Sequence, residues 1–264
     1  MKLIFFPFFR FRGLLNRLLP WLVPIIIVIL WQWASSRGQI SSRIAPSPVA
    51  VLEAAWELTK TGELLKHLWA SFLRASAGFT LGAAIGFVFG VANGMSRRFE
   101  ILFDTTLQMA RNIPHLAMIP LLILWFGIGE ESKLFLVVLG VFFPVYINTF
   151  HGIRSVDAGL VEMGESYGLS KGQLFLQVIL PGALPSILVG VRYALGFTWL
   201  TLIVAEMIAA PSGIGYMAMT AREFMQTDVV LLSILLYALL GKLADTSSRR
   251  LERGLLAWQV VAVK

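Results

Sequence analysis

Cysteine is absent from this chain of 264 residues. Its absence excludes disulfides, thiolate nucleophiles and thiolate metal sites. Charged residues are scarce as well, at 14% of the chain, whereas soluble globular proteins have roughly 25%. With 57% hydrophobic residues and a mean hydropathy of +0.77, the composition argues against a soluble enzyme, a secreted module and a disordered protein.

Histidine and phosphate-binding motifs are similarly lacking. The three histidines, His67, His115 and His151, have no metal-ligand spacing. No Gly-x-x-x-x-Gly-Lys-Ser/Thr loop is present, so the sequence predicts no ATP site of its own. The formal charge of +7 does not indicate nucleic acid as a partner, because the cytoplasmic loops of membrane proteins collect Lys and Arg.

Long apolar stretches are what the chain has instead. A membrane-spanning helix takes about 20 residues, and six stretches can be drawn, which predicts an all-α polytopic membrane protein with one permease domain over 1–264. The stretches are Leu18–Ala34, Phe72–Met95, Ile101–Ile128, Leu134–Phe150, Leu184–Ala210 and Val229–Leu243. The first is interpreted as a retained helix after a short tail, 1–17, rather than a cleaved signal peptide, because Trp31 and Trp33 close it and more spans follow.

The distribution of Lys and Arg predicts the orientation. With the N-terminus in the cytoplasm, the outside segments hold six cations, the spans hold Arg74, Arg111 and Arg192, and thirteen of the 22 fall inside. The thirteen are Lys2, Arg10, Arg12, Arg17, Arg97, Arg98, Arg154, Lys171, Lys242, Arg249, Arg250, Arg253 and Lys264. This excess satisfies the positive-inside rule, so both termini are expected in the cytoplasm. Membrane lipid is expected around the spans.

Outside the membrane, the segment from Ser35 to Ser71 is expected to contain helices. Ser47-Pro48 is typical of a helix start, and apolar residues follow at helical spacing. We expect an amphipathic helix at the outer surface, a break at Gly62 and a helix leading into the second span.

Five glycines recur every fourth residue through the second span: Gly78, Gly82, Gly86, Gly90 and Gly94. Close approach of helices in lipid depends on small residues, so the row predicts a shallow groove that packs against neighbouring helices. A sliding surface for conformational change is compatible with the same row.

The loop at about 155–180, between the fourth and fifth spans, is apolar yet too broken to cross the membrane. Leu160, Met163, Gly164 and Tyr167 fall on one helical face, and Glu162, Glu165 and Ser166 lie off it. Gly168 suits the end of that helix, and Ser170 with Gln173 forms a capping-box pattern that opens the next. The alternatives are an ordinary interfacial helix and a docking element for a cytoplasmic partner.

Within this loop, residues 162–168 read Glu-Met-Gly-Glu-Ser-Tyr-Gly, and after nine residues 178–181 read Val-Ile-Leu-Pro. The pattern resembles the EAA signature of bacterial ABC importer permeases: Glu-Ala-Ala, three residues, Gly, nine residues, Ile-x-Leu-Pro. Met163 and Gly164 replace the two alanines, and Val178 replaces the isoleucine.

Further strings resemble the nitrate/sulfonate/taurine branch of that family, and within it most closely the aliphatic-sulfonate permeases. They are 111–120, 124–129, 143–149, Ala205-Glu206 with 212–216, and 241–245. Permeases for taurine, nitrate and pyrimidine precursors share most of these strings, so all these substrates stay open.

The resemblance implies the type I permease fold and a subunit of the bacterial inner membrane that is not itself an enzyme. It implies a second copy of this chain, two cytoplasmic ATPase subunits that bind ATP and Mg, and a periplasmic or extracellular substrate-binding protein. Closure of the ATPase dimer would drive alternating access through a coupling helix. The residues implied for coupling are Leu160, Glu162, Met163, Glu165, Ser166, Tyr167, Gly168 and Leu169.

Ionisable residues inside spans are candidates for the translocation path. Arg111 and Arg192 lie some ten and eight residues from the cytoplasmic side of their spans, and a path of one charge sign concentrates the opposite ion. Asn112 and His115 belong to a helix interruption that needs protein or water around it, and Glu206 lies near the outer surface. The alternative is that the arginines pair with acids or carbonyls to hold the bundle.

Two other functions remain as alternatives. A stand-alone secondary transporter would be expected to show internal repeats, and none is convincing. An intramembrane enzyme would need a set of catalytic residues. His115 and Glu206 are candidates, but the sequence offers no nucleophile or group of metal ligands to accompany them.

Overall fold

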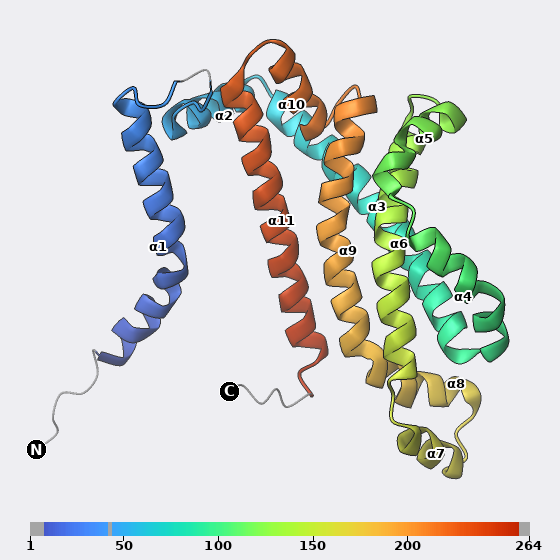
Figure 1. Cartoon of the computed structure of the whole chain (residues 1–264). Helices are drawn as coiled ribbons and strands as arrows, with labels where there is room; N and C mark the ends of the chain where they lie inside the picture. The colour runs from blue at the N-terminus through green and yellow to red at the C-terminus, as the bar shows by residue number, and fades with distance from the viewer. Residues whose placement is uncertain (1–7, 42–43, 259–264) are drawn as a thin grey trace, which may run out of the picture. The chain divides into compact units, whose positions relative to one another are not determined.

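The computed structural model describes residues 8–41 and 44–258, and all regular structure in them is helical (Figure 1). The chain forms two compact units. Unit 1 comprises Met1–Leu64 and Thr220–Leu232, and unit 2 comprises Leu65–Met219 and Ser233–Lys264.

Unit 1 holds α1 (Phe8–Ser36) and α2 (Pro48–Lys60). Ser47 caps α2 as predicted, since its Oγ accepts a hydrogen bond from the amide of Ala50 at 3.2 Å. The side chain of Gln32 accepts another from the amide of Val49 at 3.3 Å and so joins α1 to α2. The predicted break at Gly62 is present, with a φ of +78° that favours glycine.

Unit 2 holds most of the remaining helices. They are α3 (Glu63–Met95) from Leu65 onward, α4 (Arg97–Arg111), η1 (His115–Met118), α5 (Ile119–Phe126), α6 (Glu130–Arg154), α7 (Ala158–Ser166), α8 (Lys171–Leu174), η2 (Phe175–Ile179), α9 (Leu180–Ala209), most of α10 (Ile214–Glu223) and the larger part of α11 (Thr227–Leu255).

In the described part of the chain, four helical stretches are long and apolar enough to cross a membrane: α3, α6, Lys171–Ile208 and α11. A fifth span is formed if α4 and the η1–α5 segment, which meet at a bend of 82°, count as one. The bend falls at the predicted interruption, where Pro114 disfavours helical conformation of the residue before it. In the described residues of α1, the stretch Trp21–Ser36 is a shorter apolar helix, and it corresponds to the first of the six predicted spans.

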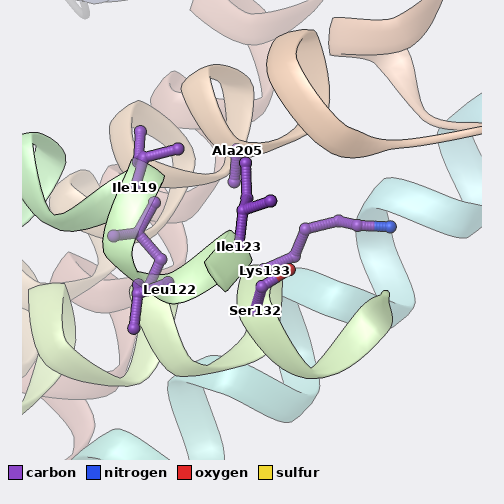
Figure 2. Close-up of a pocket in the computed structure, with 7 residues that line it drawn as sticks. Ile119, Leu122, Ile123, Ser132, Lys133 and Ala205 are labelled. Atoms are coloured by element: carbon purple, nitrogen blue, oxygen red, sulfur yellow. The ribbon is translucent and has the colours of Figure 1, made fainter. Parts of the chain in front are cut away.

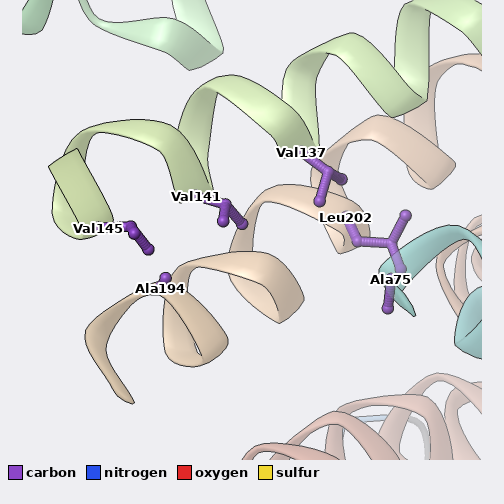
Figure 3. Close-up of a cluster of buried hydrophobic side chains, with 6 residues drawn as sticks. All are labelled: Ala75, Val137, Val141, Val145, Ala194 and Leu202. Atoms are coloured by element: carbon purple, nitrogen blue, oxygen red, sulfur yellow. The ribbon is translucent and has the colours of Figure 1, made fainter. Parts of the chain in front are cut away.

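Helix α6 lies at the centre of the unit 2 core. Figure 3 shows Val137, Val141 and Val145 of α6 directed toward residues of α3 and α9, among them Ala194 and Leu202. All of these side chains are buried. The middle of α6 packs against α9, and the candidate functional residues lie near the ends of these two helices.

The five regularly spaced glycines of α3 all face α6. A Cβ built on Gly78, Gly82, Gly86, Gly90 or Gly94 would lie 2.5–2.9 Å from an atom of α6. At Gly86 that atom is the backbone carbonyl oxygen of Phe142, at 2.6 Å, which no rotamer change can move. The two helices therefore touch backbone to backbone, as is typical of small-residue packing in membranes.

Gly86→Ala is expected to lower the free energy of unfolding by about 1–3 kcal/mol, because α3 must move away from α6. The measurement is the unfolding midpoint of the purified protein in detergent. Gly241→Ala in α11 is the matched control: its Cβ meets nothing within 4 Å, so it gains helix propensity without a clash. Equal stability of the two variants would contradict the prediction.

Candidate functional site

The loop between α6 and α9 forms a short helix, α7, with defined ends. The side chain of Asp157 accepts a hydrogen bond from the amide of Gly159 at 2.7 Å and caps the start. Gly168, with a φ of +78°, follows the last turn and reverses the chain, as predicted. These local signals fix where α7 begins and ends.

The chain then enters α8 through the predicted capping box. The amide of Gln173 donates to Ser170 Oγ at 3.4 Å, and the Gln173 side chain accepts from the amide of Ser170 at 2.9 Å. A π-helical turn, η2, and then α9 follow without a break. Since Leu174 and Ile179 are buried in the same cluster as Ile153 of α6, this loop is anchored to the span on each side of it.

Two sides of α7 have different surroundings. Gly164 is buried, and a Cβ on it would lie 2.6 Å from Leu174 Cδ1 of α8. Leu160, Met163 and Tyr167 are 47%, 50% and 82% exposed. The sequence places Gly164 on one face with these three, but the structure separates them, because the missing side chain is what lets α8 approach.

The predicted coupling residues are mostly exposed. Glu162, Glu165, Ser166 and Gly168 are exposed along with the three apolar side chains, and Leu169 is half-buried. The Ser166 hydroxyl donates to the Glu162 carbonyl at 2.9 Å, within the helix. The result is an unpartnered apolar surface flanked by two carboxylates, a combination suited to docking on another protein. We call it the α7 surface, defined by Leu160, Glu162, Met163, Glu165 and Tyr167.

At the opposite end of α9, Glu206 is the centre of a buried polar cluster. Its side chain is 1% exposed and accepts hydrogen bonds from Ser71 Oγ at 2.8 and 2.9 Å and from Arg74 Nη1 at 2.9 Å. The amide of Gly215 and the hydroxyl of Tyr237 donate to Oε2 at 3.0 and 3.1 Å. One carboxylate thereby holds α3, α9, α10 and α11 together.

Arg74 extends this cluster toward the surface. Its Nε and Nη2 form a bidentate pair with Glu130 at 2.6 and 2.8 Å, and its Nη1 and Nη2 also donate to Ser212, at 2.5 and 2.9 Å. Lys133, only 2% exposed, donates to Glu130 at 2.8 Å. The guanidinium is thus saturated, which is how a charge near a membrane interior is kept at low cost.

The loop from α9 to α10 fits closely over this cluster. Gly213 has a φ of +119°, and a Cβ on it would collide with the Glu206 carboxyl group. Its amide donates to His67 Nδ1 at 3.1 Å. Only glycine fits both the conformation and the space.

The bend between α4 and η1 carries the other predicted path residues. Arg111 is the exposed last residue of α4, and the side chain of Asn112 donates to the Gln108 carbonyl at 3.0 Å. His115 is half-buried, with Nε2 3.4 Å from Thr201 Oγ1 of α9. The structure therefore brings His115, but not Arg111, into hydrogen-bond range of α9.

Arg192 forms an ion pair instead, from Nε to Asp245 Oδ1 at 2.8 Å. This geometry is the bundle-holding alternative raised from the sequence. Sequence reasoning singled out Arg74 and Glu206 but missed their partners Ser71, Glu130 and Tyr237. The sequence signal that could have indicated this cluster is the presence of opposite charges, Arg74 and Glu206, near the predicted outer ends of two spans.

A small apolar cavity lies beside the buried cluster, between α5, α6 and α9. Figure 2 shows its lining, with the Lys133 side chain running away from Ile119 and Leu122. Its volume of about 10 Å³ suffices for one water molecule at most, so it is no substrate site. No group of three or more His, Cys, Asp or Glu residues suited to a metal exists in the parts of the chain covered by the structure.

Comparison with known proteins adds family and fold. The model of the binding-protein-dependent transport system inner membrane components matches residues 78–256. The chain is 62% identical, over 92% of its length and 93% of the relative's, to an Escherichia coli K12 protein named as an aliphatic sulfonates transport permease, SsuC. It is 38% identical, over 88% of its own length and 86% of the relative's, to the taurine transport system permease protein TauC of the same organism. A structure of the inward-facing MetNI methionine ABC transporter superposes with a TM-score of 0.62 at 20% identity, covering 73% of this chain and 95% of that one.

Proposed function

The chain belongs to the binding-protein-dependent transport system inner membrane components, the permease subunits of ABC importers, and we propose that its cargo is a small aliphatic sulfonate. The observation that carries the proposal is the identity of 62% with the sulfonate permease, against 38% with the taurine permease, over nearly the same length. Taurine, nitrate and a pyrimidine precursor are the alternative cargoes.

Growth on single sulfur sources tests the cargo. The chain is expressed, with its cognate ATPase and binding protein, in a bacterium deleted for its own sulfonate and taurine permeases. We expect growth on an alkanesulfonate and weak or no growth on taurine, with sulfate as the control that supports every strain. Growth on taurine but not on alkanesulfonate would contradict the proposal.

We propose that two copies of this chain assemble with two cytoplasmic ATPase subunits, which bind ATP and Mg, and with an external substrate-binding protein. The α7 surface supports the ATPase contact, because it is apolar, exposed and firmly anchored. The whole chain acts as one permease domain. Uptake into liposomes by the purified chain alone, without ATP, would favour a secondary transporter.

The same proposal places both termini in the cytoplasm. Its support is the excess of thirteen cations inside over six outside. Part of the predicted tail at 1–17, namely residues 1–7, lies outside the described residues. Residues 42–43 and 259–264 also lie outside them.

We propose further that Arg111, Asn112 and His115 face the translocation path, because the 82° bend there leaves His115 beside α9 and Arg111 and Asn112 exposed. The saturated Glu206 supports the outer end of the path through its cluster and does not touch the cargo. Arg192, whose side chain is 38% exposed and pairs with Asp245, is assigned to holding α9 and α11 together at the cytoplasmic end rather than to contact with the cargo.

A further inference from the structure

Two adjoining clefts run between α9 and α11, both within unit 2. Their volumes are about 560 and 580 Å³, and they share Val189 and Arg192 in their walls. Together they form one groove, which we call the α9–α11 groove. Its two halves differ in chemistry.

The half between the start of α9 and the end of α11 is basic. Asp245 accepts hydrogen bonds from Arg192 Nε at 2.8 Å and from Arg249 Nε at 3.0 Å. One carboxylate thus orients two guanidiniums while both pairs use only Nε, so the terminal Nη groups remain available as donors. Arg253 lines the same half and forms no ion pair with the described residues. Three guanidiniums face two carboxylates there, those of Asp245 and Glu252.

The other half runs along α9 toward the middle of the span, and beyond Arg192 and Asp245, where it meets the basic half, its lining is aromatic and aliphatic. Tyr193, Phe197 and Leu200 line it and are 61%, 41% and 65% exposed. From Val189 to Leu200 the helix rises about 16 Å, at about 1.5 Å per residue. This length matches one leaflet, since the hydrocarbon core is about 30 Å thick.

We propose that the α9–α11 groove binds an anionic phospholipid, with the phosphate on Arg192, Arg249 and Arg253 and an acyl chain along Tyr193, Phe197 and Leu200. Guanidiniums bind phosphate through paired N–H donors, and basic pockets between transmembrane helices on the cytoplasmic side suit anionic headgroups. The assignment to the cytoplasmic leaflet rests on the orientation proposed above.

A free oxyanion, including the sulfonate cargo, shares the headgroup chemistry. Only an amphiphile whose chain is about one leaflet long fills both halves of the groove, which is why the lipid is favoured. The two sources are separable, because a small oxyanion needs the arginines alone, whereas a lipid also needs the apolar half.

The test is native mass spectrometry of the importer complex, released from nanodiscs that contain phosphatidylglycerol and phosphatidylcholine. We expect the wild-type complex to retain phosphatidylglycerol selectively. The double variant Arg249→Gln/Arg253→Gln should retain at least about tenfold less, since each lost charge-assisted bond contributes about a factor of ten. Arg250→Gln is the matched control, because Arg250 is on the same turn of α11 but does not line the groove, and retention should stay within about twofold.

Val189→Trp is a second variant that keeps every charge and fills the point where the two halves meet. It should also reduce retention, and it covers the case in which the double variant fails to fold. Three results would each overturn the proposal. They are equal losses in the double variant and in Arg250→Gln, unchanged retention in Val189→Trp, and displacement of the lipid by excess inorganic phosphate or hexanesulfonate. The lipid readout requires no transport, so it stands or falls separately from the sulfonate assignment.

Discussion

Glu206→Ala is expected to lower the free energy of unfolding by about 3–5 kcal/mol, the loss typical of removing one partner of a buried ion pair. The carboxylate accepts hydrogen bonds from Ser71, Arg74 and Tyr237 and from the amide of Gly215. Without it, these donors stay buried and unpaired, and the loop that carries Gly213 loses its support. The measurement is the unfolding transition of the purified protein in detergent.

Two variants make that result specific. Glu206→Gln keeps an acceptor oxygen and the side-chain volume, so it should lose less stability than Glu206→Ala. Glu162→Ala removes an exposed acid of α7 and should change stability by no more than about 0.5 kcal/mol. If Glu206→Ala unfolds at the wild-type midpoint, the cluster does not stabilise this end of the bundle.

Local signals in the sequence were sufficient for several elements. The caps at Ser47 and Ser170, and the glycines at 62 and 168, act within a few residues of chain, and the structure has them where they are predicted. The interruption around Pro114 is likewise local, although only the structure gives its angle of 82°. Family membership also follows from the sequence, because the EAA pattern lies in one short loop.

Contacts between distant segments could not be predicted in the same way. Arg74 and Glu206 are 132 residues apart, and nothing in their local sequence selects one as the partner of the other. Gly164 shows the same limit on a smaller scale. Helical periodicity places it with Leu160 and Met163, but packing by α8 decides which of them is buried.

The α7 surface gives the second large effect. Tyr167→Ala is expected to weaken binding of the ATPase subunit by about 30-fold, because an exposed aromatic that becomes buried on docking typically contributes about 2 kcal/mol. Tyr167 is 82% exposed in the chain by itself, so the variant should unfold at the wild-type midpoint. Co-purification of the ATPase and sulfonate uptake are the two measurements.

The contrast with Tyr167→Phe separates docking from general damage. Phenylalanine keeps the ring, so it should retain most of the ATPase binding, and Met163→Leu should do the same, because it keeps an apolar side chain beside Glu162. A Tyr167→Ala variant that still co-purifies the ATPase and imports at the wild-type rate would show that the ATPase docks elsewhere. Loss of uptake in all three variants would point to the fold of α7 itself, because only the alanine variant removes contact area from an otherwise unchanged helix.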